Sequence, residues 1–195
     1  MVVLSLISAA ASLPEESWYS VLYGGGTRGR YALPETAPFC MLTAIMHHPF
    51  FVYGTLKPGE PNYARFLAGR TRGEEPASLS GAALYSAGSY PYLVAEPDLA
   101  APDERVDGTI ISVADDDYAI ILAQLDGLEG YTEGGTANLY ERLLVTVDTA
   151  AGPCVAWVYV AGTENLARIR AGDLPKVPDG NWQSDPAALR YWSTQ

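Results

Sequence analysis

A glutamate at position 129 lies where the surrounding pattern predicts an apolar side chain. In the stretch DDDYAIILAQLDGLEG (115–130), apolar residues recur at helical spacing and define one inward stripe: Tyr118, Ile121, Leu122, Leu125 and Leu128. Glu129 falls near the middle of this stripe. Burial would raise the pKa of a glutamate from roughly 4.3 towards neutrality, where a carboxyl group can shuttle protons. Glu129 is therefore a candidate general acid and base.

Two structural alternatives stay open for Glu129. The helix could end at Gly127 and release the acid to solvent, or Glu129 could pair with Arg142 in the next strand. Asp126 falls at the edge of the stripe, where it reaches water more easily. Gly127, Gly130 and the loop TEGGTAN (132–138) supply the flexibility that a lid over Glu129 would need, although surface loops often have this composition too.

A second candidate is the loop that ends the apolar run FFVYGTLKPG (50–59). The run stops at Gly54 and Thr55 and then turns through Lys57, Pro58 and Gly59. Glycine lets another group approach the backbone closely, and successive N–H groups in a turn can bind an anion. The loop is thus either a simple turn or a backbone site for a ligand.

Composition excludes several classes of function. The 195 residues are 48% hydrophobic, enough for one domain plus a tail, and the net charge of −11 opposes binding to nucleic acid or anionic membranes. The acids at 115–117 suit a helix N-terminus better than a metal site. With two adjacent histidines and two distant cysteines, the chain offers no metal-ligand set or disulfide framework, so we predict reduced thiols in a cytoplasmic protein.

Residues 1–45 differ in character from the rest of the chain. Their opening MVVLSLISAAAS has an apolar core but lacks the basic region of a secretory signal, and YGGGTRGRYALPETAP (23–38) is rich in glycine and proline without a sustained period. We predict a flexible extension or misassigned start over 1–45 and one folded domain over 46–195. No apolar stretch approaches the ~20 residues that span a bilayer.

Six short runs bounded by Gly, Pro or Asp predict strands: 50–53, 82–86, 92–95, 108–113, 139–147 and 154–161. In LYERLLVTV (139–147) one face is polar or lines a cavity, whereas CVAWVYVA (154–161) is apolar throughout and predicts cover on both faces. Helices are expected near 115–130 and, more weakly, over 62–69. The predicted class is α+β, a small mixed β-barrel of about six strands with flanking helices.

Several segments, in this order, resemble the γ-glutamylcyclotransferase family, in particular its γ-glutamylamine cyclotransferase-like branch. They are VYGTLKPG (52–59), YPYLV (90–94), DGTIISV (107–113), LDGLEGY (125–131), YERLLVTV (140–147) and AWVYV (156–160). The resemblance covers about residues 48–162. It implies a mixed barrel, a substrate-holding loop at Tyr53, Gly54, Thr55 and Leu56, and a catalytic glutamate at Glu129.

The resemblance also implies a reaction in which the α-amine of a γ-glutamyl compound attacks its own γ-carbonyl, yielding 5-oxoproline and a free amine. It implies no metal or organic cofactor. Tyr92, Tyr131 and Tyr140 match recurring aromatic positions without a firm role. The alternatives are a non-catalytic small-molecule binding barrel and an enzyme of this fold with different acyl-transfer chemistry. The C-terminal stretch QSDPAALRYWSTQ (183–195) is a candidate helix that closes one barrel end.

Overall fold

The structure is a computed structural model that describes residues 47–192. The predictions made for residues 1–45 fall outside this part of the chain and stay predictions. Within the described residues, no helix is long and apolar enough to cross a membrane.

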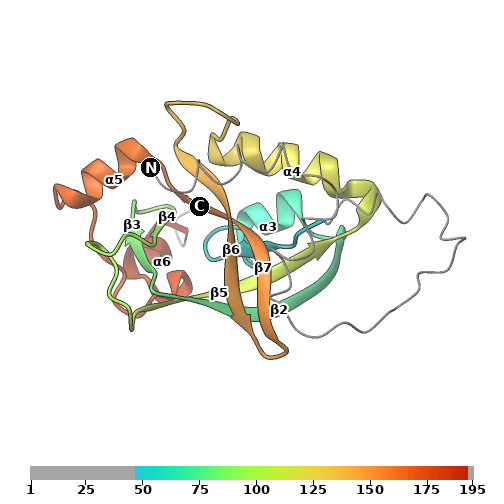
Figure 1. The fold of residues 1–195 in the computed structure, drawn as a ribbon, viewed down its shortest axis with the longest axis horizontal. Helices are drawn as coiled ribbons and strands as arrows, with labels where there is room; N and C mark the ends of the chain where they lie inside the picture. The colour runs from blue at the N-terminus through green and yellow to red at the C-terminus, as the bar shows by residue number, and fades with distance from the viewer. Residues whose placement is uncertain (1–46, 193–195) are drawn as a thin grey trace, which may run out of the picture. The chain divides into compact units, whose positions relative to one another are not determined.

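Five strands close into a small barrel in the order β1-β5-β2-β6-β7 (Figure 1). These strands are β1 (Phe50–Val52), β2 (Thr71–Ser80), β5 (Arg105–Val113), β6 (Tyr140–Thr149) and β7 (Gly152–Ala161). The barrel is mixed because β1 pairs antiparallel with β5 and parallel with β7. A separate hairpin joins β3 (Ala83–Ser86) to β4 (Pro91–Val94). The predicted α+β barrel is confirmed.

Strand β2 was absent from the prediction. Its sequence TRGEEPASLS carries three charged residues and an internal proline, and only Ala77 and Leu79 are buried. Proline is tolerated because β2 pairs along its length with β5 but meets β6 only at Ala77 and Ser78. Most of the strand behaves as an edge and shows no apolar alternation, so its sequence gives little strand signal.

Strand β1 separates two apolar clusters by the alternation of its side chains. Phe51 joins the barrel interior with residues such as Val106 and Val158, whereas Phe50 and Val52 pack in the cluster that includes the inward face of the long helix. The expected cover on both faces of β7 is wrong at Val155, whose side chain is 45% exposed. Only the second half of β7 is well covered.

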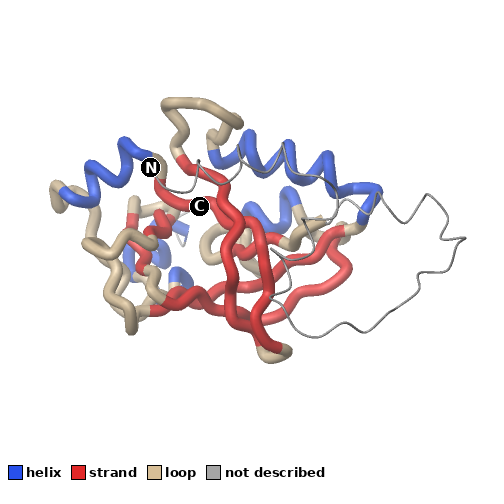
Figure 2. The backbone as a smooth tube through the Cα atoms, in the orientation of Figure 1, coloured by secondary structure: helices blue, strands red, loops and turns tan. Residues whose placement is uncertain are grey.

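The helices flank the strands, as the blue segments in Figure 2 show. They are α3 (Pro61–Phe66), α4 (Asp115–Glu129), α5 (Thr163–Arg170) and α6 (Pro186–Trp192), with a 3₁₀ turn η3 at Trp182–Ser184. Helix α5 was not predicted. The acids at 115–117 occupy the first turn of α4, as expected. The helix runs past Gly127 and ends at Gly130 in a left-handed conformation with φ 62°, so Glu129 is its last residue.

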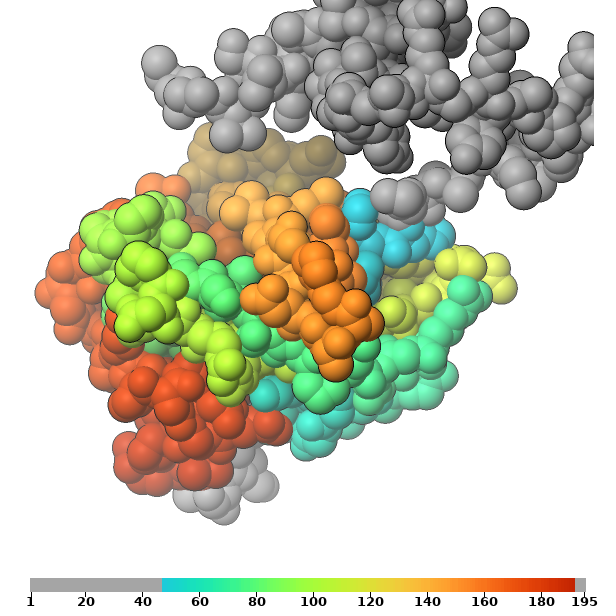
Figure 3. Space-filling model, turned by 60° about the horizontal axis from the view of Figure 1, so that its bottom comes forward, coloured from blue at the N-terminus to red at the C-terminus, as the bar shows by residue number. Residues whose placement is uncertain are grey.

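The C-terminal segment packs against the β3–β4 hairpin and the residues that follow it. The N–H of Val177 donates to the carbonyl of Leu84, and Lys176 pairs with Glu104 at 2.7 Å. Figure 3 shows the segment in red beside the yellow-green residues near 100. Trp182 is 1% exposed and anchors the segment in the barrel cluster.

Candidate active site

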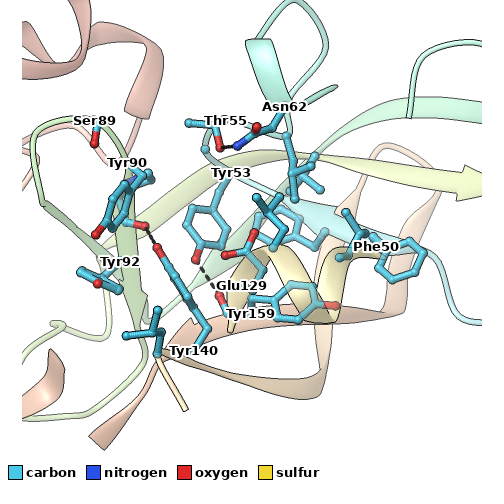
Figure 4. A pocket seen from close by; sticks show the side chains of 18 of the residues that line it. Phe50, Tyr53, Thr55, Asn62, Ser89, Tyr90, Tyr92, Glu129, Tyr140 and Tyr159 are labelled. Atoms are coloured by element: carbon cyan, nitrogen blue, oxygen red, sulfur yellow. Dashed lines mark hydrogen bonds between the residues drawn. The ribbon is translucent and has the colours of Figure 1, made fainter. Parts of the chain in front are cut away.

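The predicted substrate-holding loop and Glu129 line the same pocket of about 310 Å³ (Figure 4). Tyr53, Gly54, Thr55 and Leu56 enter from the end of β1, and Glu129 enters from the end of α4. The barrel brings these two stretches together because β1 and α4 share one apolar cluster. Figure 4 shows the Glu129 side chain reaching towards the Tyr53 ring.

The Glu129 side chain is half-buried and makes no hydrogen bond or ion pair with any other described residue. Burial raises the pKa of Glu129 to about 7, because the carboxylate loses hydration that no partner replaces. A group with this pKa populates both protonation states near neutral pH. Such a group can both accept and return a proton.

Asp126, one turn before Glu129, forms the ion pair with Arg142 that the sequence analysis considered for Glu129. Arg142 contacts Asp126 at 3.0 Å, and the hydroxyl of Tyr159 donates to the other oxygen of Asp126 at 2.8 Å. The pairing of Arg142 with Glu129 is therefore wrong. The Asp126 side chain is 23% exposed, so part of it still reaches water from the edge of the stripe.

The Arg142 guanidinium is held between aromatic rings. Its central carbon lies 5.0 Å from the ring centre of Tyr131 and 4.8 Å from that of Trp157. These contacts and the bond to Asp126 tie strands β6 and β7 to helix α4. The cluster fixes the helix turn that carries Glu129 while leaving the Glu129 carboxylate uncompensated.

The loop after β1 offers backbone donors. Among the backbone hydrogen bonds of residues 47–192, none is donated by the N–H groups of Gly54, Thr55 or Leu56. The Thr55 hydroxyl accepts a bond from the Asn62 amide at 2.8 Å, which fixes its rotamer. Three successive N–H groups in a pocket can bind an anion or a developing oxyanion.

Gly54 is required by a protein contact rather than by a special backbone angle. A Cβ atom at this position would lie 2.8 Å from Cγ of Pro91, the first residue of β4. The close approach that the sequence led us to expect from a ligand is thus made by Pro91. The carbonyl of Pro91 in turn accepts a hydrogen bond from Tyr140 at 2.8 Å.

Tyrosines form much of the pocket wall. Burial raises the pKa of Tyr53 and Tyr140 well above the usual value, and the nearby Glu129 charge adds to both shifts. Burial also raises the pKa of Tyr92 and Tyr159. These hydroxyls stay protonated near neutral pH, so Glu129 is the proton-exchanging group among the pocket residues with a resolved shift.

The pocket contains residues that the sequence analysis missed. Of the three tyrosines left without a role, Tyr92 and Tyr140 line the pocket and Tyr131 does not. Asn62, Tyr90, Tyr159 and Tyr191 line it and were not singled out. Tyr159 had one signal, its place in a strand beside the predicted cavity face of β6, because it pairs with Arg142 in the ladder. Tyr191 lies near the chain end, and no pattern in the sequence indicated it as a pocket residue.

No cluster of three or more His, Cys, Asp or Glu side chains suited to a metal ion occurs between residues 47 and 192.

A closed mixed barrel, with a tyrosine-lined pocket that holds one acid among its described lining residues, is typical of a small-molecule-binding domain of α+β class. The sequence model of the family described as "Gamma-glutamyl cyclotransferase, AIG2-like" matches residues 50–184. The chain belongs to this family. Membership supports γ-glutamyl cyclotransferase activity in general and a small-molecule substrate.

The chain is similar to a curated relative and to solved structures. The chain is 31% identical over 124 residues to the "Gamma-L-glutamyl-butirosin B gamma-glutamyl cyclotransferase" of Niallia circulans, covering 63% of this chain and 72% of that protein. The crystal structure of YkqA from Bacillus subtilis superposes with a TM-score of 0.51 at 21% identity. That likeness covers 76% of this chain and 43% of YkqA, so the chain spans less than half of that protein. An AIG2-like protein from Mus musculus gives 0.48 at 23% identity, covering 71% and 90% of the two chains.

Proposed function

We propose that this protein cleaves a γ-glutamyl amide by intramolecular attack of the α-amine, releasing 5-oxoproline and a free amine. The observation that carries the proposal is the unpaired Glu129 carboxyl, with its pKa raised to about 7, in the same pocket as the backbone donors of 54–56. The absence of a cofactor and the cytoplasmic location remain predictions from sequence.

The reaction needs little from the protein beyond positioning and proton transfer. The α-nitrogen bonds to the γ-carbonyl carbon and closes a five-membered ring, so the nucleophile is part of the substrate. Such tethering is worth about 7–11 kcal/mol when the reacting atoms are aligned. Glu129 takes one proton from the attacking nitrogen and gives it to the leaving nitrogen as the old C–N bond breaks. Atoms and charge balance without a protein nucleophile.

The backbone N–H groups of residues 54–56 support the positioning of the substrate and the stabilisation of its charged oxygens. Attack on the carbonyl places negative charge on its oxygen, and the substrate also carries an α-carboxylate. Both groups need donors in a pocket whose wall is largely apolar and aromatic. We assign Gly54, Thr55 and Leu56 to holding the γ-glutamyl part of the substrate, with Tyr53 shaping the loop through its 2.6 Å hydrogen bond to the carbonyl of Tyr159.

A panel of γ-glutamyl amides and dipeptides, with 5-oxoproline measured as product, tests the proposal. Glu129→Gln is expected to lower kcat/KM by about 10²–10⁴-fold, because it removes the proton carrier and keeps the shape. Glu133→Gln, in the exposed loop just after α4, is the matched control and should match the wild type. The wild-type kcat/KM is also expected to fall below about pH 7, as Glu129 becomes protonated.

Two results would contradict the proposal. A folded Glu129→Gln variant that turns over at the wild-type rate would remove the acid and base role. A wild-type protein that binds γ-glutamyl amides but forms no 5-oxoproline would favour the non-catalytic binding barrel.

A further inference from the structure

The mouth of the pocket is marked by three exposed apolar side chains. Tyr90 is 41% exposed, Leu139 53% and Tyr191 43%, whereas the lining residues next to the Glu129 carboxyl, such as Tyr53 and Tyr159, are buried. A substrate with its reacting amide at Glu129 would therefore extend its other end towards these three residues. In Figure 4, Tyr90 lies at the side of the pocket away from Phe50.

One of the three comes from outside the part of the chain that matches the family. The family match ends at residue 184, and Tyr191 belongs to α6, which begins at Pro186. This chain therefore completes its pocket with a residue that the family pattern does not supply. Tyr191 is a candidate for setting which substrate this particular protein accepts.

A buried hydrogen bond joins the two segments that carry Tyr90 and Tyr191. The hydroxyl of Ser86 donates to Asp185 at 2.9 Å and accepts from the N–H of Gly88 at 3.2 Å. Asp185 also accepts from the N–H of Ala188 at 3.2 Å. Ser86 and Asp185 are 4% and 7% exposed, so this link is shielded from water. It connects the loop that leads to Tyr90 with the start of the helix that carries Tyr191.

The charges of the pocket restrict the substrate further. Glu129 is the only charged residue among the described residues that line it, and neither Lys nor Arg is among them. Arg168 acts on Tyr92 from a distance, but it is exposed on α5 and donates to Asn165 at 3.1 Å. The donors of 54–56 can accept the α-carboxylate of the γ-glutamyl group. A second carboxylate would be desolvated without a cation.

We propose that Tyr90, Leu139 and Tyr191 form a leaving-group subsite for an apolar or aromatic amine that has no carboxylate beside its nitrogen. This inference rests on the proposed function and narrows its substrate class. Flat rings stack on tyrosine, and an amine without a carboxylate avoids the unpaired charge.

Three substrates that differ in one group each test the subsite: the γ-glutamyl amides of methylamine and of 2-phenylethylamine, and γ-glutamyl-phenylalanine. The last two differ only by the carboxylate on the carbon bonded to the leaving nitrogen. The wild type is expected to prefer the phenylethylamide over γ-glutamyl-phenylalanine by at least about 30-fold in kcat/KM.

Tyr191→Ala tests the specificity-determining residue. It is expected to lower kcat/KM for the phenylethylamide by about tenfold while changing the methylamide by less than about twofold. Tyr191→Phe keeps the ring and should restore the preference. Leu189→Ala is the control on the same helix, because Leu189 is exposed and does not line the pocket. Thermal melting of each variant confirms that it is folded.

The outcomes separate the two proposals. Equal loss on both amides in Tyr191→Ala, or no preference against γ-glutamyl-phenylalanine, overturns the subsite and leaves the cyclotransferase activity standing. A wild-type protein that turns over other γ-glutamyl amides of the panel but none of these three also overturns the subsite alone. Failure on the whole panel overturns the proposed function, and the subsite with it.

Discussion

A carboxyl group that is desolvated and unpaired binds its proton more tightly in the folded chain than in the unfolded one. For Glu129, burial raises the pKa to about 7 in the folded protein, against roughly 4.3 when unfolded. Folding is therefore coupled to proton uptake at this residue between these two values. The contribution of Glu129 to stability is largest below the unfolded pKa and is lost as the pH rises towards 7.

This coupling predicts a pH-dependent gain from Glu129→Gln. We expect the variant to be more stable than the wild type, and the difference in unfolding free energy to grow by about 2 kcal/mol between pH 5 and pH 8. Urea unfolding at the two pH values measures it. Glu133→Gln should show no such growth. A difference in unfolding free energy between variant and wild type that stays constant with pH would mean that the Glu129 carboxyl remains hydrated.

A second prediction at the residue scale follows from the packing of Gly54 against Pro91. Gly54→Ala places a methyl group 2.8 Å from Cγ of Pro91, which should displace the loop and cost about 1–3 kcal/mol of stability as well as activity. Gly73→Ala on β2 is the control, because nothing lies within 4 Å of its Cβ position. Thermal melting and 5-oxoproline formation are the readouts. Equal behaviour of the two variants would count against a tight Gly54–Pro91 contact.

Single residues could be predicted where the chemistry follows a local pattern. Glu129 breaks a helical stripe, and the 53–56 loop ends an apolar strand, so both are visible within a few residues of sequence. The partner of Arg142 could not be predicted in this way. Asp126 and Glu129 lie one turn apart, and the choice between them depends on Tyr159 in β7. Spacing along a helix cannot distinguish two acids by their distant neighbours.

At the scale of elements, helix α4 acts as a rigid support rather than a hinge. It extends unbroken to Glu129 and is stopped by the left-handed Gly130. Gly127, which the sequence suggested as a source of lid flexibility, lies inside this helix with nothing within 4 Å of its Cβ position. The Asp126–Arg142 contact holds the same turn against the barrel.

We expect Gly127→Ala to raise stability by about 0.5–1 kcal/mol and to leave kcat/KM unchanged. The alanine favours the helix and meets no neighbouring atom. Chemical denaturation and the 5-oxoproline assay measure the two effects. A variant that gains stability but loses most of its activity would instead show that bending at Gly127 is part of the catalytic cycle.

Elements were predictable where apolar and β-branched residues formed dense short runs. The predicted runs at 108–113 and 154–161 lie within β5 and β7, and 139–147 overlaps most of β6. Strand β2 was not predicted, because its stability comes from pairing with β5 and most of its side chains face water. Helix α5 was missed for a related reason, since its short TENLARIR sequence buries only Asn165 and Ile169.

At the scale of the whole molecule, the described residues 47–192 form a closed barrel and a pocket that holds both the 53–56 loop and Glu129. A chain of this length can bury a sufficient core by itself. We therefore predict that a protein beginning at Met46 folds with the thermal stability and kcat/KM of the full chain. Side-by-side melting and 5-oxoproline assays provide the test. An insoluble or inactive shortened protein would assign residues 1–45 to the folded unit.

The fold class could be predicted from the whole chain, but the composition of the pocket could not. A dense series of short strands with one strong helix is typical of an α+β barrel. The aromatic mouth depends on Tyr90 and Tyr191, which are about a hundred positions apart and meet only through the packing of the C-terminal segment on β3 and β4. Such contacts have no periodic signature.

The division between β1 with α4 on one side and the hairpin with α6 on the other has an evolutionary consequence. Variation in the 87–90 loop or in α6 can alter which amine is recognised without touching the groups proposed to perform proton transfer. New selectivities could arise in descendants of such a chain by exchanging a terminal helix, with the catalytic apparatus inherited intact. Laboratory diversification confined to those two short segments would follow the same route.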